Sequence, residues 1–98
     1  MVEHIVLIKF SSKTTNVQKE ELIRKTLRLK DIIPGILDIQ QGMNFSSRSQ
    51  GYEVGLTVRF KDRNSLENYG PHPAHQEIVN YLKEIGLKDS IIVDFELQ

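Results

Sequence analysis

The stretch VEHIVLIKF, residues 2–10, decides the fold because it is a short strand with two apolar faces. Its richness in β-branched and large apolar residues favours a strand over a helix. Alternation places His4, Val6, Ile8 and Phe10 on one face, and Glu3, Ile5, Leu7 and Lys9 on the other. Because both faces carry apolar side chains, we expect a central strand that is covered on both sides.

The rest of the chain predicts two long helices and three further strands around this one. Thr15 or Asn16 begins a helix from 16 to about 31, and Pro34 and Gly35 end that region. Pro73 suits the first turn of a second helix, which Gly86 ends. Strands are predicted over 36–43, 52–60 and 90–97, with a polar connection over 44–51 and a short helix over 63–69. This βαββαβ order predicts a ferredoxin-like α+β fold, with an antiparallel sheet and both helices on one face.

The face of the sheet opposite the helices is predicted to be an interface. Its expected residues are apolar or lack a side chain: Ile5, Leu7, Ile39, Gly55 and Ile92. An exposed apolar patch of this kind usually marks a protein interface. We therefore expect a homodimer joined through the open faces of its two sheets.

Length and composition narrow the classes of function. The 98 residues fit one domain, residues 1–98. Lys plus Arg equals Asp plus Glu at 13 each, so no excess of positive charge points to nucleic acid or to an anionic membrane. The chain has no cysteine, its beginning has no basic leader and no apolar run is long enough to span a bilayer. We expect a cytoplasmic protein.

The segment ENYGPHPAH, residues 67–75, carries a resemblance to a known family. Together with HIVLIKF, IIPGILDIQQGMNFS and GYEVGLTVRF, it resembles the stress-responsive A/B barrel (Dabb) family over essentially the whole chain. The resemblance implies a dimeric α/β barrel in which two sheets face each other. In a plant cyclase of that family, which closes a linear polyketide by aldol condensation, a tyrosine and the second histidine of His-Pro-x-His perform the acid–base work. These match Tyr69 and His75, and a pocket histidine on the first strand matches His4.

The residues themselves support an acid–base role for this segment. If Pro73 is the first helical residue, His72 lies at the cap and His75 lies one turn into the helix. The partial positive charge of a helix N-terminus disfavours imidazolium, so His75 is expected to be neutral and able to accept a proton. Tyr69 would donate to a substrate oxygen. Structural readings stay open beside these: His72 as a cap, His75 as a tie to the backbone, Tyr69 as a core aromatic and His4 as a structural residue.

An apolar pocket is expected between the sheet and the helices. Its predicted lining, beyond Tyr69, His75 and His4, is Val6, Ile8, Leu22, Ile23, Thr26, Val54, Leu56, Val58 and Val79. The plant cyclase has a histidine in place of Val54, and aromatic residues where this chain has Leu22, Ile23 and Thr26. The cavity expected here is thus drier and differently shaped, which argues against a polyketide substrate.

Cofactors are not expected. Three histidines are in principle enough for zinc, but two of them lie on a proline-stiffened helix start without a firm carboxylate partner. The resemblance adds a magnesium ion held by main-chain carbonyls where the first helix ends, near Lys30, Ile33 and Ile36, and such a site leaves no side-chain signature.

Several functions stay open from the sequence. The first is a small homodimeric barrel, stress-related by family name only, with an apolar pocket edged by Tyr69 and His75. The second is a cyclase, isomerase or lyase that uses His75 as base and Tyr69 as donor on a small carbonyl compound. The third is a binding or structural dimer without catalysis. A cofactor-free monooxygenase of the related dimeric barrels is a weaker fourth.

Overall fold

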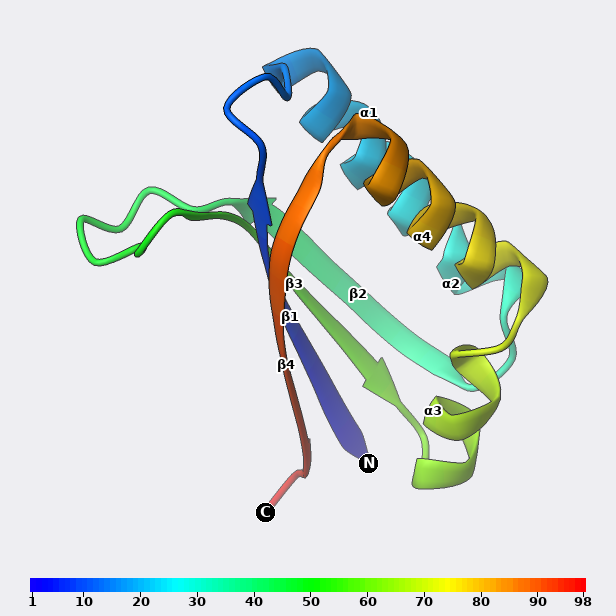
Figure 1. Cartoon of the computed structure of the whole chain (residues 1–98). Coiled ribbons are helices and arrows are strands. Elements are labelled where there is room, and N and C mark those ends of the chain that lie inside the picture. The colour runs from blue at the N-terminus through cyan, green and yellow to red at the C-terminus, as the bar shows by residue number, and fades with distance from the viewer.

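The computed structural model describes residues 1–98 and contains one four-stranded antiparallel sheet with helices on one side of it (Figure 1). The elements follow the order β1 (Val2–Phe10), α1 (Asn16–Leu27), α2 (Leu29–Ile32), β2 (Ile36–Met43), β3 (Tyr52–Phe60), α3 (Arg63–Tyr69), α4 (Pro73–Ile85) and β4 (Leu87–Glu96). The strands lie in the order β2-β3-β1-β4, so β1 is central. The predicted ferredoxin-like α+β fold is confirmed.

The first helical region begins as expected and is interrupted before its expected end. Thr15 and Gln18 form a reciprocal capping box at the start of α1. The helix stops at Leu27, and α2 resumes at Leu29 after Arg28. The Thr26 hydroxyl donates to the Leu22 carbonyl at 2.8 Å, an interaction that weakens and bends helices.

The second long helix has the proline start and glycine end that the sequence predicts. The His72 side chain caps it by accepting from the Ala74 amide at 3.1 Å, and Pro73 is its first residue. Gly86 ends it with φ of 113°, in the left-handed region that favours glycine. Strand β4 begins at Leu87, three residues before the predicted start at 90, because Gly86 turns the chain directly into pairing with Phe10.

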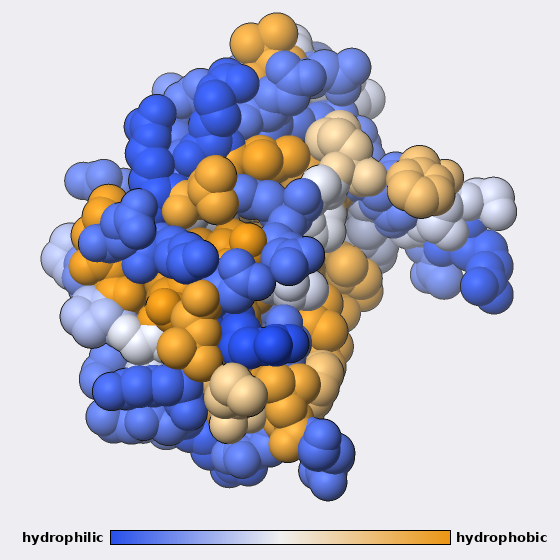
Figure 2. Space-filling model, turned by 180° about the vertical axis from the view of Figure 1, so that it is seen from behind, coloured by the Kyte–Doolittle hydropathy of each residue, from blue (hydrophilic) through white to orange (hydrophobic).

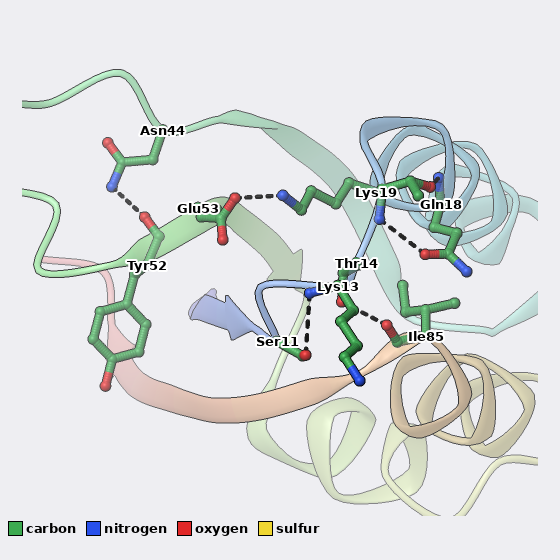
Figure 3. Close-up of polar contacts among 10 residues, drawn as sticks. Ser11, Lys13, Thr14, Gln18, Lys19, Asn44, Tyr52, Glu53 and Ile85 are labelled. Carbon is green, nitrogen blue, oxygen red and sulfur yellow. Dashed lines mark hydrogen bonds and ion pairs between the residues drawn. The ribbon is translucent and has the colours of Figure 1, made fainter.

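The side chains between sheet and helices form two buried clusters. One gathers around Phe60, Val58 and Tyr69, and the other around Phe10, Leu22 and Ile85. Polar contacts close the end of the molecule near the 44–51 hairpin: Thr14 donates to the Ile85 carbonyl at 2.5 Å, and the buried Lys19 pairs with Glu53 (Figure 3). None of the helices is long and apolar enough to cross a bilayer.

Two residues that we expected on the open face lie on the helix face instead. Residues that pair directly across two strands point to the same side of the sheet. Ile39 pairs with Val58, and Ile92 pairs with Val6, so both point toward the helices. In β2 the register shifts between Ile36 and Asp38, and this extra residue turns both Ile36 and Ile39 toward the helices. Strict alternation therefore misplaced Ile39.

The apolar positions of β4 on the open face are Ile91, Val93 and Phe95, each more than 40% exposed. They pair with Leu7, Ile5 and Glu3 of β1, respectively. The open face is thus apolar along β1 and β4, as the sequence predicted. The residues of β4 that make it apolar are Ile91, Val93 and Phe95, and not the predicted Ile92.

Candidate active site

A cavity of about 370 Å³ lies between the sheet and the helices. Its walls come from β1, β3 and β4 on one side and from α1, α3 and α4 on the other, with one residue of β2. Twelve of the nineteen lining residues are hydrophobic, so the site is apolar with a few polar groups. Pockets of this size and character are the usual form of a small-molecule site.

Most of the residues expected around a pocket line this cavity. They are His4, Val6, Ile8, Leu22, Thr26, Val54, Leu56, Tyr69, His75 and Val79. Two expected residues lie outside it. Val58 is completely buried in the core around Phe60, and Ile23 packs partly buried against the cluster that contains Leu22. Facing the helix layer was thus not enough to place these two side chains at the cavity.

Tyr69 ends α3 and forms part of the cavity wall. Its ring contacts Phe60 with centroids 5.0 Å apart and His75 with centroids 4.2 Å apart. Burial alone raises the pKa of Tyr69 to about 12. Tyr69 lines the cavity, and its hydroxyl, which bonds no group of the protein, is not sealed off, since no fully buried side-chain oxygen is left without a partner. Tyr69 is therefore a protonated phenol near neutral pH that can donate to a bound molecule.

His75 is the third residue of α4 and is half-buried at the cavity. Its Nδ1 lies 2.9 Å from the Gly70 carbonyl oxygen. A carbonyl only accepts, so Nδ1 carries the proton and Nε2 of the neutral ring has a free lone pair. Burial lowers the pKa of His75, and the Gly70 bond opposes that shift while His4 and His72 add to it. The direction agrees with the sequence argument, but burial is the leading cause.

His4 reaches the cavity from β1 and bonds a residue that sequence reasoning missed. Its Nδ1 donates to the carboxylate of Asp94, the residue directly opposite on β4. The His4 ring meets Tyr69 edge-on, with centroids 5.8 Å apart. Three polar side chains from distant parts of the sequence, His4, Tyr69 and Asp94, thus line one end of the cavity together with His75.

Alternation along β4 separates Asp94 from its neighbours in sequence, but it does not show which face of the sheet Asp94 lies on without the register of β4 against β1. Strand β4 turns Ser90, Ile92 and Asp94 toward the cavity, and only its pairing with β1 shows which alternate set does so. The remaining unpredicted lining residues are Gln41, Leu66, Gly70, Ile78, Leu82 and Leu87. Ile78 and Leu82 belonged to the predicted apolar stripe of the second helix, where lining and core residues look alike in sequence.

The metal hypotheses find no side-chain support. The protein has no group of three or more histidine, aspartate and glutamate side chains placed to hold a metal ion. Lys30 lies in α2, Ile33 is the residue that caps the C-terminal end of that helix, and Ile36 begins β2. A cation at this corner would rest on main-chain carbonyls, because the nearby carboxylate of Asp38 faces Lys30 with Nζ 3.6 Å from its Oδ1.

Comparison with known proteins shows close similarity in sequence and in fold. The model of the stress responsive A/B barrel domain, Dabb, matches residues 2–97. Olivetolic acid cyclase from Cannabis sativa is 32% identical over 76 residues, which are 76% of this chain and 75% of the cyclase.

Solved structures show the fold. An Arabidopsis thaliana protein has a TM-score of 0.89 at 24% identity and covers 100% of this chain and 96% of its own. A hydroxynitrile lyase from Passiflora edulis has a TM-score of 0.87 at 17% identity, with coverage of 99% and 93%. A dimeric ferredoxin-like protein of unknown function from Thermobifida fusca has a TM-score of 0.85 at 22% identity, with coverage of 98% and 90%.

Proposed function

The chain belongs to the stress-responsive A/B barrel family, as its sequence predicted, and on that premise we propose that it is a cofactor-independent enzyme that makes or breaks a carbon–carbon bond beside a small carbonyl group. One observation carries the proposal. The protonated hydroxyl of Tyr69 and the unprotonated Nε2 of His75 belong to rings 4.2 Å apart on the wall of one apolar cavity. The relative with 32% identity is a cyclase, which is consistent with this class of reaction.

The two side chains supply complementary halves of carbon-acid chemistry. His75 Nε2 takes a proton from the carbon next to the substrate carbonyl, and the electron pair of that C–H bond moves toward the carbonyl oxygen. The Tyr69 hydroxyl donates to this oxygen and stabilises the enolate. Because the pKa of Tyr69 is raised to about 12, the phenol stays a donor throughout.

The second half of the reaction forms the new bond. The enolate carbon attacks a second carbonyl carbon, the carbon–carbon bond forms, and the proton on His75 passes to the new alkoxide oxygen. The base is then regenerated with no oxidant or reductant consumed. The reverse sequence cleaves the same bond, so one site serves a cyclase or a lyase.

The cavity selects for neutral, largely apolar molecules. No lysine or arginine lines it, and its one acidic residue, Asp94, is engaged by His4. A phosphate or a free carboxylate would thus be desolvated there without a charged partner, which is costly. The His4–Asp94 pair fixes the His4 ring beside Tyr69, where it walls the polar end of the cavity.

We further propose that the protein is a homodimer through the open faces of its sheets. The apolar residues Ile5, Leu7, Ile91, Val93 and Phe95 adjoin one another there. Two of the flanking carboxylates are paired within the chain, Glu3 with Arg59 and Glu53 with Lys19, which reduces the charge that two identical faces would bring together. Dimeric proteins with the same fold support the arrangement.

Proton exchange tests the proposed chemistry without requiring the natural substrate. The α-hydrogens of 2-heptanone, a neutral ketone with an apolar tail, are followed by proton NMR in D₂O. We expect the protein to accelerate their exchange, and His75→Ala and Tyr69→Phe each to reduce the enzymatic rate about 100-fold. His72→Asn is the matched control, because asparagine keeps the helix cap and the rate should not change. If the wild-type protein exchanges no faster than buffer, the acid–base proposal fails and a binding role remains.

A further inference from the structure

We propose that the 44–51 hairpin of each protomer reaches across the dimer and seats Phe45 in a groove on the partner's sheet, above Gly42 and Gly55. We call this surface the glycine groove; Ile5, Leu7, Gln40 and Thr57 also line it. The inference rests on the proposed dimer and adds the contact that fixes its register.

Phe45 is the first observation. Its side chain is 100% exposed, in a loop whose other residues, apart from glycine, are polar. The base of the hairpin is ordered: the Asn44 amide nitrogen donates to the Glu53 carbonyl at 2.8 Å, and Asn44 Nδ2 donates to the Tyr52 carbonyl at 2.7 Å (Figure 3). A large aromatic side chain is thus fully exposed to solvent on a loop whose base is fixed by hydrogen bonds. This exposure favours a contact with another molecule.

The glycines are the second observation. Gly42 and Gly55 lie directly opposite each other on β2 and β3. Neither has a positive φ, and a Cβ added to either would meet nothing within 4 Å. Glycine weakens a strand. It normally occurs there because the backbone conformation requires it or because another group lies too close for a side chain. The protomer contains neither, and we infer that the neighbour for which these glycines leave room lies on another molecule.

The position of the groove identifies that molecule as a second copy of the chain. Gly55 pairs with Leu7, which pairs with Ile91, so the groove continues into the apolar face of the proposed dimer. Phe45 of the same protomer, with its neighbours Asn44 and Ser46, also lines the groove, so the hairpin adjoins it. Contacts across a two-fold interface are reciprocal, so if one Phe45 enters the partner's groove, the partner's Phe45 enters the first groove in the same way. In Figure 2 the hairpin stands away from the body, with hydrophobic surface on the flank beneath it.

The groove suits an aromatic side chain. Its lining carries no charged residue, and the paired glycines leave bare backbone over which a ring can lie flat. Aromatic side chains stabilise strand glycines by covering them in this way. The reciprocal contact would bury both exposed phenylalanines at once.

A double-mutant cycle measured by sedimentation equilibrium tests the contact. Phe45→Ala removes the ring, and Gly55→Val fills the groove at a site with open space and strand-favouring chemistry. We expect each single variant to raise the dimer dissociation constant about tenfold or more, and the double variant to be little weaker than either one. Val17→Ala, on a 70% exposed residue of α1, is the matched control and should leave dimerisation unchanged.

The outcomes separate this inference from the dimer on which it rests. Wild-type protein that stays monomeric overturns both. A wild-type dimer whose dissociation constant is unchanged by Phe45→Ala overturns only the hairpin contact. Additive effects of the two substitutions would also overturn it, since they would place Phe45 and Gly55 at separate contacts. Thermal unfolding of Gly55→Val as a monomer checks folding, and we expect no loss of stability because the added side chain meets open space.

Discussion

At the scale of single residues, the seven residues 69–75 set the geometry between the two proposed catalytic side chains. Tyr69 closes α3, Gly70 and Pro71 make the bend, and His75 is the third residue of α4. The bend brings the phenol and the imidazole together, and the Gly70 carbonyl fixes the tautomer of His75. His72, more conspicuous in sequence because it precedes Pro73, is used as the cap. The local signals were therefore readable, while the meeting with His4 and Asp94 depended on strand pairing.

The direction of the His75 shift gives a pH profile for ketone exchange. Burial lowers the pKa of His75 from 6.5. The neutral form of the ring, which accepts a proton, therefore predominates at every pH above this lowered pKa. The rate should rise with pH through that lowered pKa and level off above it. It should then fall only as Tyr69 loses its proton near pH 12. Initial rates between pH 4 and pH 10 check the rise and the plateau, and a half-maximum above pH 6.5 would contradict the assignment of His75 as base.

The same shift contributes to stability with a defined sign. His75 binds a proton more weakly in the folded protein than in the unfolded chain. Its contribution to the free energy of unfolding is thus fully present above pH 6.5 and is lost as pH falls toward the folded-state pKa.

At the scale of elements, a single glycine joins α4 to the sheet. Gly86 has φ of 113°, and a Cβ there would lie 2.7 Å from Thr14 Oγ1 and 3.0 Å from Ser11 Cβ. Gly86→Ala should lower the free energy of unfolding by about 1–3 kcal/mol, because strain and crowding act together. Urea denaturation measures the change.

Lys83→Ala is the matched control for this prediction. Lys83 is exposed in the last turn of the same helix and takes part in no ion pair of the protein. Its free energy of unfolding should stay within about 0.5 kcal/mol of wild type. Equal losses in the two variants would show that the left-handed turn at Gly86 is not what holds the helix end.

The elements also show where sequence reasoning reached its limit. The strands 2–10, 36–43 and 52–60 and the short helix at 63–69 are as predicted, because apolar alternation and turn residues are local signals. The break at Arg28, the register shift after Ile36 and the early start of β4 were not predicted. The last two depend on pairing with a distant strand, and the break follows the bond from the Thr26 hydroxyl to the Leu22 carbonyl, which periodicity does not reveal. Consequently Ile39, Ile92 and Asp94 could not be assigned to the correct face or site from alternation alone.

At the scale of the whole molecule, one sheet separates two functions. The helix face holds the cavity with Tyr69 and His75, and the opposite face holds the apolar residues proposed to join two protomers. Only 19 of the 98 residues are buried in the single chain, so covering the open face would add substantially to its core.

Leu7→Glu tests this division because Leu7 lies in the middle of the open face, between Gly55 and Ile91. We expect wild-type protein to show a Tm that rises with concentration, as dissociation linked to unfolding requires. The variant would place a desolvated charge on each face of the dimer, so it should sediment as a monomer with a lower, concentration-independent Tm. Val17→Glu, on exposed α1, should behave as wild type.

The ketone exchange rate of the Leu7→Glu monomer completes the test. All residues proposed for catalysis and for the cavity wall come from one chain, and none of them is Leu7. The folded monomer should therefore retain exchange within a few-fold of wild type at temperatures below its Tm. Loss of exchange in a variant that remains folded by circular dichroism would mean that the dimer shapes the cavity from behind the sheet. A variant that remains dimeric would instead refute the open face as the interface.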